Sequence, residues 1–284
     1  MFLADNAGEY RLLDTGDGMK LESWGGYILS RPDPQAIWEK EKPGLWKTAH
    51  AKYVRSSKGG GEWEFSKKLP DSWNITVGGL KFIVRPTGFK HTGLFPEQSA
   101  NWAFMQETLK KRPNADVLNL FAYTGGATLA CMSAGAKVVH VDAAKGMVQW
   151  AKENAAASGL SERPARYIVD DCLKFVMREQ RREHFYDGII MDPPSYGRGA
   201  DGSIWKIEDD LFSLIKEAAK LLCDPLFFVI SSYTTGLSDV VVKNMLELTV
   251  AKAFGGSIAS GVLALPVDGS NVILPCGNTA RWTK

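Results

Sequence analysis

The chain has 284 residues, of which 45% are hydrophobic, and a formal net charge of +2 at pH 7. This length is enough for one large domain with a full core and a second, smaller domain. The near-neutral charge neither requires nor excludes nucleic acid as a partner, because a basic face can be hidden in a balanced total.

The four cysteines, Cys131, Cys172, Cys223 and Cys276, are far apart in the sequence and form no CxxC pair. This pattern is typical of reduced thiols, so we expect no metal site and no disulfide framework. No apolar run approaches the roughly 18 residues of a membrane span. The first residues lack the basic start of a signal peptide. We therefore expect a soluble cytoplasmic protein.

Residues 1–92 are rich in Gly, Trp and short alternating runs, which predicts a small β-rich domain. Two apolar runs, 73–77 and 80–84, flank Gly78 and Gly79, a strong hairpin signal. With a two-residue turn, Val77 faces Leu80 and Ile75 faces Phe82, so one face is apolar. Two roles for this domain remain open. It either braces the larger domain or grips the substrate.

From residue 116 onward, apolar runs of strand length alternate with segments of helical spacing. The early strands are linked by helices and must be parallel, whereas a short turn at 266–269 reverses the last one. We expect a Rossmann-like, seven-stranded, doubly wound α/β sheet with the last strand antiparallel, in a domain spanning 93–284. The predicted strands are 116–121, 137–142, 165–170, 186–192, 225–232, 257–265 and 271–281, and the predicted helices are 101–112, 126–134, 145–158, 172–182, 208–222 and 239–253.

Residues 116–142 form the pattern strand, glycine turn, helix, strand and acid, which is half of a nucleotide-binding βαβ unit. Gly125 and Gly126 would let the main chain approach a ligand without a Cβ in the way. Asp142 is placed to accept two hydrogen bonds from a ribose diol. Neither Gly-x-Gly-x-x-Gly nor a P-loop is present, which leaves a nucleoside without pyrophosphate, commonly S-adenosylmethionine. The alternative is an ordinary α/β turn with glycines for packing.

Ligands of open parallel sheets bind outside the carboxyl ends of the strands. Asp171, with the N–H of Cys172, is suited to pair with the amino group and ring nitrogen of an adenine. The alternative is that Asp171 only caps the next helix. The residues that follow the first five predicted strands are Phe121, Tyr123, Thr124 and Gly125; then Asp142; then Asp170, Asp171 and Cys172; then Asp192, Pro193, Pro194, Ser195 and Tyr196; then Ser231, Ser232 and Tyr233.

The run Asp192-Pro193-Pro194 is the second strong signal. Two prolines exclude a helix and remove two N–H donors, which leaves the carbonyls and the Asp192 carboxylate as acceptors facing the expected site. Such a loop suits a base amino group or a nucleophile awaiting a methyl group. Tyr196 is placed to stack on a flat ring. The alternative is a proline-stiffened loop over a buried Asp192.

Residues 119–126 (NLFAYTGG), Asp142, Asp171 and the Asp-Pro-Pro run together resemble the class I S-adenosylmethionine-dependent methyltransferases. More narrowly, the chain is similar to the bacterial 23S ribosomal RNA large-subunit methyltransferases that carry a small β-rich domain before the catalytic one. Residues 91–98 (HTGLFPEQ) resemble the segment that enters the cofactor site in that group. The resemblance covers roughly residues 75–235.

The resemblance implies that S-adenosylmethionine is the cofactor and that the methyl acceptor is a base in RNA, with ribosomal RNA as the expected class. It also implies roles for single residues. Gln98, Phe121, Tyr123, Thr124 and Gly125 would line the cofactor, Asp142 would hold its ribose, Asp171 and Cys172 would face the adenine, and Asp192, Pro193 and Tyr196 would serve the methyl-transfer centre.

The acceptor atom is not fixed by the sequence. In the family, methylation at carbon 5 of cytosine needs a cysteine thiolate after the fourth or the fifth strand. Here those places hold Ser195 and Ser231-Ser232-Tyr233. Base-amino methyltransferases have an aromatic residue directly after Asp-Pro-Pro, where this chain has Ser195. Methylation of a ring nitrogen fits best by elimination.

Basic residues that would support RNA binding are modest in number. Those in or near the first domain are Lys67, Lys68, Lys81, Arg85, Lys90 and His91, and a second run, Arg178, Arg181, Arg182 and His184, is typical of a solvated helix end. Two alternatives to an RNA methyltransferase therefore stay open. One is methyl transfer to a small molecule or a protein, and the other is a cofactor-binding module without catalysis.

Overall fold

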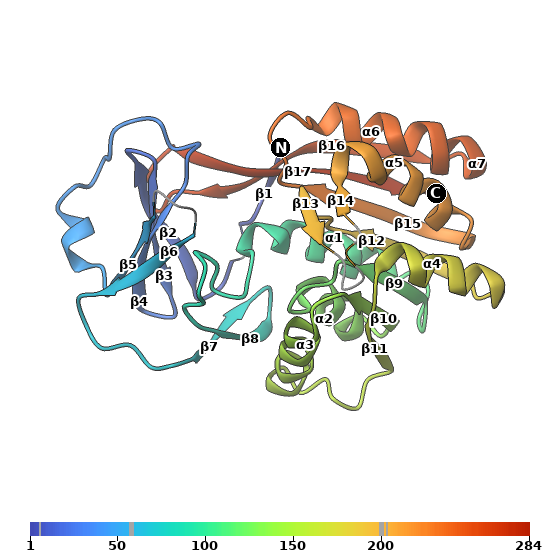
Figure 1. The fold of residues 1–284 in the computed structure, drawn as a ribbon, viewed down its shortest axis with the longest axis horizontal. Coiled ribbons are helices and arrows are strands. Elements are labelled where there is room, and N and C mark those ends of the chain that lie inside the picture. Colours follow the sequence, from blue (N-terminus) through green and yellow to red (C-terminus); the bar gives the residue numbers. More distant parts are fainter. Residues whose placement is uncertain (6, 57–59, 199–201, 203) are drawn as a thin grey trace. The chain divides into compact units, whose positions relative to one another are not determined.

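A computed structural model of the chain describes residues 1–5, 7–56, 60–198, 202 and 204–284 (Figure 1). These residues group into two compact units. The larger unit comprises Met1–Phe2, Asn101–Leu263 and Cys276–Lys284, and the smaller unit comprises Leu3–Ala100 and Ala264–Pro275. The domain limits of 1–92 and 93–284 expected from the sequence stay a prediction.

The larger unit is built on an eight-stranded sheet in the order β1-β16-β17-β15-β12-β9-β10-β11. The five neighbouring strands β15, β12, β9, β10 and β11 pair in parallel, and β17 pairs antiparallel with β15. The doubly wound sheet with a reversed last strand is thus confirmed. The eighth strand, β1, has two residues, too few to show any periodicity in a sequence. The strands are β1 (Phe2–Leu3), β9 (Asp116–Leu120), β10 (Lys137–Asp142), β11 (Ala165–Val169), β12 (Tyr186–Met191), β15 (Leu222–Ser232), β16 (Ser257–Pro266) and β17 (Ile273–Thr283).

The helices follow the predicted segments within a few residues. The last predicted helix, 239–253, contains a π-helical stretch, η3, between two α-helical parts. The helices are α1 (Ser99–Leu109), α2 (Gly126–Ser133), α3 (Lys145–Ala157), α4 (Cys172–Arg181), α5 (Ile207–Ala219), α6 (Asp239–Leu246), η3 (Glu247–Ala251) and α7 (Lys252–Phe254). Among the residues that the structure describes, no helix is long and apolar enough to cross a membrane.

The strand β9 shows how the two faces of the sheet are covered. Leu118 and Leu120 join one buried core with residues of α4 and α5, among them Phe175 and Leu214. Asn119 lies between the two leucines and points to the opposite face, because side chains alternate along a strand. There its Nδ2 donates a hydrogen bond of 2.9 Å to Oγ1 of a buried α2 residue, Thr128. Helices α4 and α5 therefore cover one face, and α2 covers the other.

The smaller unit contains a five-stranded sheet in the order β2-β3-β4-β5-β6 and a separate two-stranded hairpin, β7-β8. The hairpin confirms the predicted register, since Val77 pairs with Leu80 across the Gly78-Gly79 turn. Both glycines have positive φ, as the tight primed turns of hairpins require. The strands are β2 (Tyr10–Gly16), β3 (Met19–Trp24), β4 (Tyr27–Pro32), β5 (Ala51–Arg55), β6 (Gly61–Phe65), β7 (Trp73–Val77) and β8 (Leu80–Val84), and the short helices are η1 (Leu45–Thr48) and η2 (Pro96–Gln98).

Candidate functional site

The loop between β9 and α2 has an unusual backbone. Phe121 and Tyr123 adopt positive φ values of 55° and 50°, and Gly125 has a φ of 88°. For residues other than glycine this left-handed conformation costs of order 1 kcal/mol or more, and it persists only where the surroundings impose it. Strain of this kind concentrates at ligand sites. The loop is thus shaped by its neighbours rather than by its own preferences.

Hydrogen bonds from the neighbouring strands and helices hold this loop. The Phe121 N–H donates to Sγ of Cys172 at 3.4 Å, and the Tyr123 N–H donates to Oδ2 of Asp142 at 2.8 Å. On the other side, Nδ2 of the buried Asn154 of α3 donates to the Thr124 carbonyl at 2.8 Å. The loop is therefore tied to the end of β10, to the first residue of α4 and to α3.

The two glycines of this loop are explained by packing. A Cβ on Gly126 would lie 2.5 Å from the indole of Trp102 on α1, and a Cβ on Gly125 would lie 3.0 Å from Cβ of Ala151 on α3. The space beside each α carbon is filled by protein. Packing, the alternative raised from the sequence, therefore accounts for the absence of a Cβ at both positions. The approach of a ligand to this backbone stays a prediction.

Asp142 ends β10 and is half-buried. Each of its carboxylate oxygens accepts one backbone N–H, Oδ2 from Tyr123 and Oδ1 from Ala144, both at 2.8 Å. Burial raises the pKa of Asp142, while these two hydrogen bonds act to lower it. An ionised carboxylate has about four acceptor positions, so one further donor can still be accommodated on each oxygen. The geometry thus suits a pair of hydroxyl donors such as a ribose diol.

Asp171 and Cys172 lie at the start of α4. Oδ1 of Asp171 accepts the Lys174 N–H at 2.9 Å, so Asp171 is the N-cap of this helix. Asp171 therefore caps this helix through Oδ1, and a role of its second carboxylate oxygen toward an adenine stays a prediction. Cys172 is buried, and burial raises the pKa of its thiol. Its sulfur is thus a neutral acceptor for the Phe121 N–H and not a nucleophile.

The Asp192-Pro193-Pro194 run follows β12 at the same carboxyl-end edge of the sheet. Asp192 is half-buried, Pro193 is buried and Pro194 is exposed. The Pro194 carbonyl oxygen accepts a hydrogen bond of 2.7 Å from Nε1 of Trp205. One acceptor position of this carbonyl is thus filled by the chain itself, and a role of the carbonyl toward a ligand stays a prediction.

A short hairpin, β13 (Tyr196–Arg198) and β14 (Ile204–Lys206), follows the proline run. Tyr196 is 50% exposed, and its hydroxyl accepts a hydrogen bond of 3.1 Å from Nε of Arg198. Trp205 of β14 lies with its ring centroid 5.2 Å from that of Phe121. The sequence predicts neither this hairpin nor the place of Trp205, because the two strands have three residues each, too short for a periodic signal.

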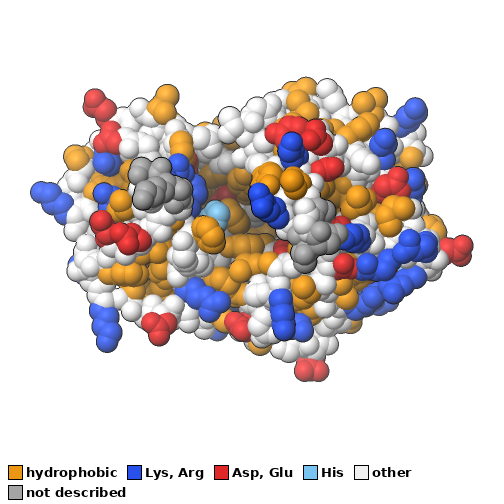
Figure 2. All heavy atoms as spheres, in the orientation of Figure 1, with side chains coloured by type: hydrophobic (Ala, Val, Ile, Leu, Met, Phe, Trp, Pro, Cys, Tyr) orange, Lys and Arg blue, Asp and Glu red, His pale blue; other side chains and the backbone are white. Residues whose placement is uncertain are grey.

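The remaining predicted positions lie on other elements. Gln98 ends η2, in the smaller unit. Ser231, after β15, is buried, and its Oγ accepts Nδ2 of Asn101 at 3.1 Å, which ties α1 to the sheet. The arginines of α4 make local contacts, since Arg178 pairs with Asp170 and Arg182 with Glu179. Figure 2 shows basic side chains gathered where Figure 1 labels α4, and the pairs fit the expected solvated helix end.

An open, mostly parallel sheet with a strained glycine loop and acids after successive strands defines a nucleoside-binding α/β protein. A family model described as S-adenosylmethionine-dependent methyltransferase matches residues 46–226. The chain belongs to this family, which confirms the class and the cofactor expected from the sequence.

Relatives and solved structures agree with this assignment. Proteins named ribosomal RNA large subunit methyltransferase K/L match with 32% identity over 167 residues in Pseudoalteromonas atlantica (58% of this chain, 23% of that protein) and 34% over 140 residues in Vibrio cholerae (49% and 19%). The chain spans less than a quarter of the length of these relatives. The crystal structure of a SAM-dependent methyltransferase from Agrobacterium tumefaciens is 35% identical, with a TM-score of 0.94 over 99% of this chain and 92% of that one.

Proposed function

We propose that this chain transfers the methyl group of S-adenosylmethionine to a base in RNA, with ribosomal RNA as the substrate class. The family membership supports the methyl donor. The names of the curated relatives support the RNA acceptor. Because ribosomal RNA is found in the cytoplasm, this proposal also places the protein there.

The hydrogen bonding of Asp142 is the observation that carries the proposal, through its cofactor part. Its carboxylate accepts the Tyr123 N–H of the strained loop and the Ala144 N–H just before α3, and each oxygen can still accept one more hydrogen bond. A cofactor ribose diol would complete those positions. The neutral, buried Cys172 and the positive-φ residue Phe121 keep the loop in the shape that the nucleoside would meet.

The remaining cofactor contacts are proposed from the same edge of the sheet. The second oxygen of Asp171 would accept from the adenine amino group. The N–H of Cys172 would donate to a ring nitrogen, because the first N–H groups of a helix have no acceptor within the helix. The other residues of the larger unit proposed to line the cofactor are Phe121, Tyr123, Thr124, Gly125 and Asp192.

When bound, S-adenosylmethionine would supply a sulfonium methyl group to a nitrogen of the base. An N–C bond would form as the C–S bond breaks, and S-adenosylhomocysteine would leave. The protein's part is mainly positioning. Asp192 and the Pro193 carbonyl would accept hydrogen bonds from the acceptor and hold its nitrogen lone pair toward the methyl carbon. Tyr196, half-exposed on the adjacent hairpin, would stack on the base. A proton lost by the acceptor would pass to water.

The Asp192→Ala variant tests this assignment. We expect its affinity for S-adenosylhomocysteine to stay within about threefold of the wild type, and its transfer of labelled methyl groups to ribosomal RNA to fall by about 100-fold or more. The matched control is Asp209→Ala, which removes an exposed acid of α5 in the same unit. Full turnover by Asp192→Ala would remove Asp192 from the mechanism. Label that stays on protein or on a small molecule after RNase treatment would favour a different acceptor.

A further inference from the structure

The side chains of Ser195 and Thr234 join two loops of the larger unit. Ser195 directly follows the Asp192-Pro193-Pro194 run after β12, and Thr234 lies two residues after the end of β15. The strands β12 and β15 are neighbours that pair in parallel, so both loops leave the same carboxyl-end edge of the sheet (Figure 1). The two hydroxyl oxygens are 2.6 Å apart, within the range of an O–H···O hydrogen bond. One hydroxyl therefore donates to the other and links the loops.

The Asp192-Pro193-Pro194 run depends on anchors from outside. Its two prolines have no N–H, so the backbone cannot be anchored through donors at these positions. The carbonyls at the end of the run are used instead. The Pro194 carbonyl accepts Nε1 of Trp205 at 2.7 Å, and the Ser195 carbonyl accepts the N–H of Ile207, the first residue of α5, at 3.1 Å. The hydroxyl bond of Ser195 adds a side-chain anchor from a third segment.

Thr234 can serve as an anchor because its own loop is fixed. Its N–H donates to Oγ of Ser232 at 3.3 Å, and its carbonyl accepts the Leu237 N–H at 3.2 Å. The Leu237 carbonyl in turn accepts Nδ2 of Asn278 of β17 at 2.7 Å. The Thr234 hydroxyl thus projects from a backbone that is held within the loop and tied to the next strand of the sheet.

The surroundings of this hydroxyl pair indicate what it can contribute. Ser195 is exposed and Thr234 is half-buried, so water can replace either hydroxyl as a partner when the other is removed. The bond therefore contributes little to the free energy of unfolding. Its effect is on the geometry of the loop, where a displacement of about 1 Å can cost a large factor in rate.

We propose that Thr234 is a positioning residue for methyl transfer. Through Ser195 it holds the loop with Asp192 and Pro193 in the shape that receives the methyl acceptor. Thr234 acts through Ser195 and not on the acceptor itself. The inference rests on the proposed function, because the loop that Thr234 holds is the one assigned there to the acceptor.

The test compares steady-state transfer of labelled methyl groups to ribosomal RNA by variants of the full chain. Thr234→Val removes the hydroxyl with little change of shape, and kcat should fall about fivefold, the factor expected for one neutral hydrogen bond. Its affinity for S-adenosylhomocysteine should stay within about twofold of the wild type. Thr234→Ser keeps the hydroxyl and should keep kcat within about twofold. The matched control is Thr235→Val, which removes the exposed hydroxyl of the next residue and should leave kcat unchanged.

A double-mutant cycle shows whether the two hydroxyls act as one unit. Ser195→Ala should lower kcat by about the same factor as Thr234→Val. The double variant should also lose about fivefold, and not the roughly 25-fold of two independent sites, because either single change removes the same bond. Urea midpoints of unfolding should stay close to the wild-type value, which separates positioning from a loss of folded protein.

The outcomes distinguish this role from the proposed function. Wild-type kcat in Thr234→Val, or multiplied losses in the double variant, would overturn the role of Thr234 and leave the proposed function standing. A fall in kcat that follows a fall in the urea midpoint would assign Thr234 to folding and overturn the role as well. Label transferred to protein or to a small molecule in place of RNA, with the same coupled loss, would overturn the RNA acceptor and leave the role of Thr234 standing.

Discussion

The indole N–H of Trp205 donates a hydrogen bond of 2.7 Å to the carbonyl oxygen of Pro194. The ring of the same tryptophan lies 5.2 Å from the ring of Phe121, between centroids. One side chain therefore joins the loop after β9, proposed to hold the cofactor, to the loop after β12, proposed to hold the acceptor. In this account Trp205 is a positioning residue that acts through both loops.

Trp205→Phe separates the two contacts, because it keeps an aromatic ring near Phe121 and removes the N–H donor. Losing one hydrogen bond of about 1 kcal/mol should lower kcat about fivefold, with S-adenosylhomocysteine affinity within about twofold of the wild type. Trp205→Ala should weaken cofactor binding as well. Steady-state kinetics and calorimetry measure the two effects. Wild-type kcat in Trp205→Phe would show that the Pro194 contact does not position the acceptor loop.

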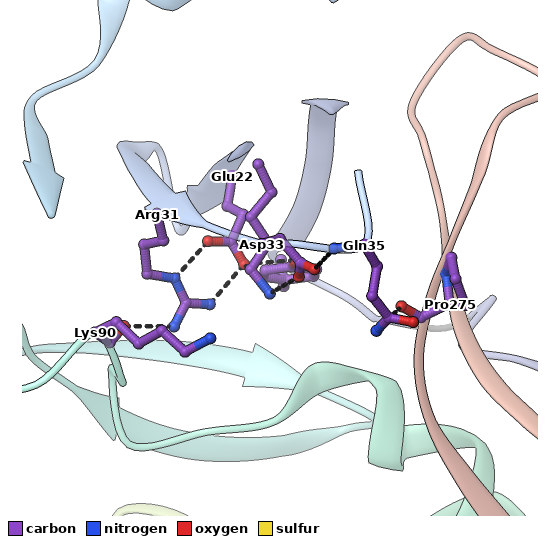
Figure 3. Close-up of polar contacts among 8 residues, drawn as sticks. Glu22, Arg31, Asp33, Gln35, Lys90 and Pro275 are labelled. Atoms are coloured by element: carbon purple, nitrogen blue, oxygen red, sulfur yellow. Dashed lines mark hydrogen bonds and ion pairs between the residues drawn. The ribbon is translucent and has the colours of Figure 1, made fainter. Parts of the chain in front are cut away.

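In the smaller unit, Nε and Nη2 of Arg31 donate to the two carboxylate oxygens of the buried Glu22, both at 2.6 Å (Figure 3). Breaking this pair should destabilise the smaller unit. Glu22→Gln leaves a buried guanidinium without its counter-charge, and we expect the free energy of unfolding to fall by about 3–5 kcal/mol in urea titrations. Replacing both residues by Met removes the unpaired charge and should cost less than Glu22→Gln alone. A double variant as unstable as the single one would contradict this account.

The same pair predicts a pH dependence. The folded-state pKa of Glu22 lies below its ordinary value, so the unfolded chain binds more protons in the acidic range. The stabilisation is present above the unfolded pKa and is lost as the pH falls through the folded pKa. As the pH is lowered below about 4.5, the urea midpoint of unfolding should therefore fall more steeply for the wild type than for the double Met variant. Parallel pH profiles would exclude Glu22 as the cause.

Covalent catalysis through a cysteine is not expected. Cys131 and Cys172 are buried, and burial raises the pKa of both thiols. Attack on carbon 5 of cytosine needs a thiolate near the base. RNA containing 5-fluorocytidine should therefore give no covalent adduct with the wild type on denaturing gels. A stable adduct that maps to one of the cysteines would contradict the acceptor chemistry proposed here.

The parallel pairing of the central strands and the register of the β7-β8 hairpin were predictable from local sequence patterns. The strands β9, β10 and β12 are runs of buried apolar residues between helical segments, and connection length alone made them parallel. The Val77–Leu80 register followed from the two-glycine turn. Such signals arise within a few residues of one another, so the sequence contains them.

Contacts between distant segments were not predictable in the same way. The Trp102 indole leaves no room for a Cβ at position 126, and the Trp205 indole donates to the Pro194 carbonyl. Each tryptophan lies on a different element from its partner, and no local sequence pattern reports such packing. The Asp171 cap was foreseen as an alternative because capping is local. For the proposed site residues, therefore, the sequence suggested which residues lie at the edge of the sheet, and the structure shows which of their atoms are already engaged.

The central claim is that Asp142 holds the cofactor ribose at the carboxyl-end edge of the sheet. Titration calorimetry with S-adenosylhomocysteine on the wild type and on Asp142→Ala tests it most directly, with Asp209→Ala as the control for loss of an exposed acid in the same unit. The account predicts saturable binding by the wild type and the control, and binding about 30-fold weaker or more by Asp142→Ala, the loss of two hydrogen bonds to a charged group. Equal affinity in all three proteins, or no binding by the wild type, would contradict it.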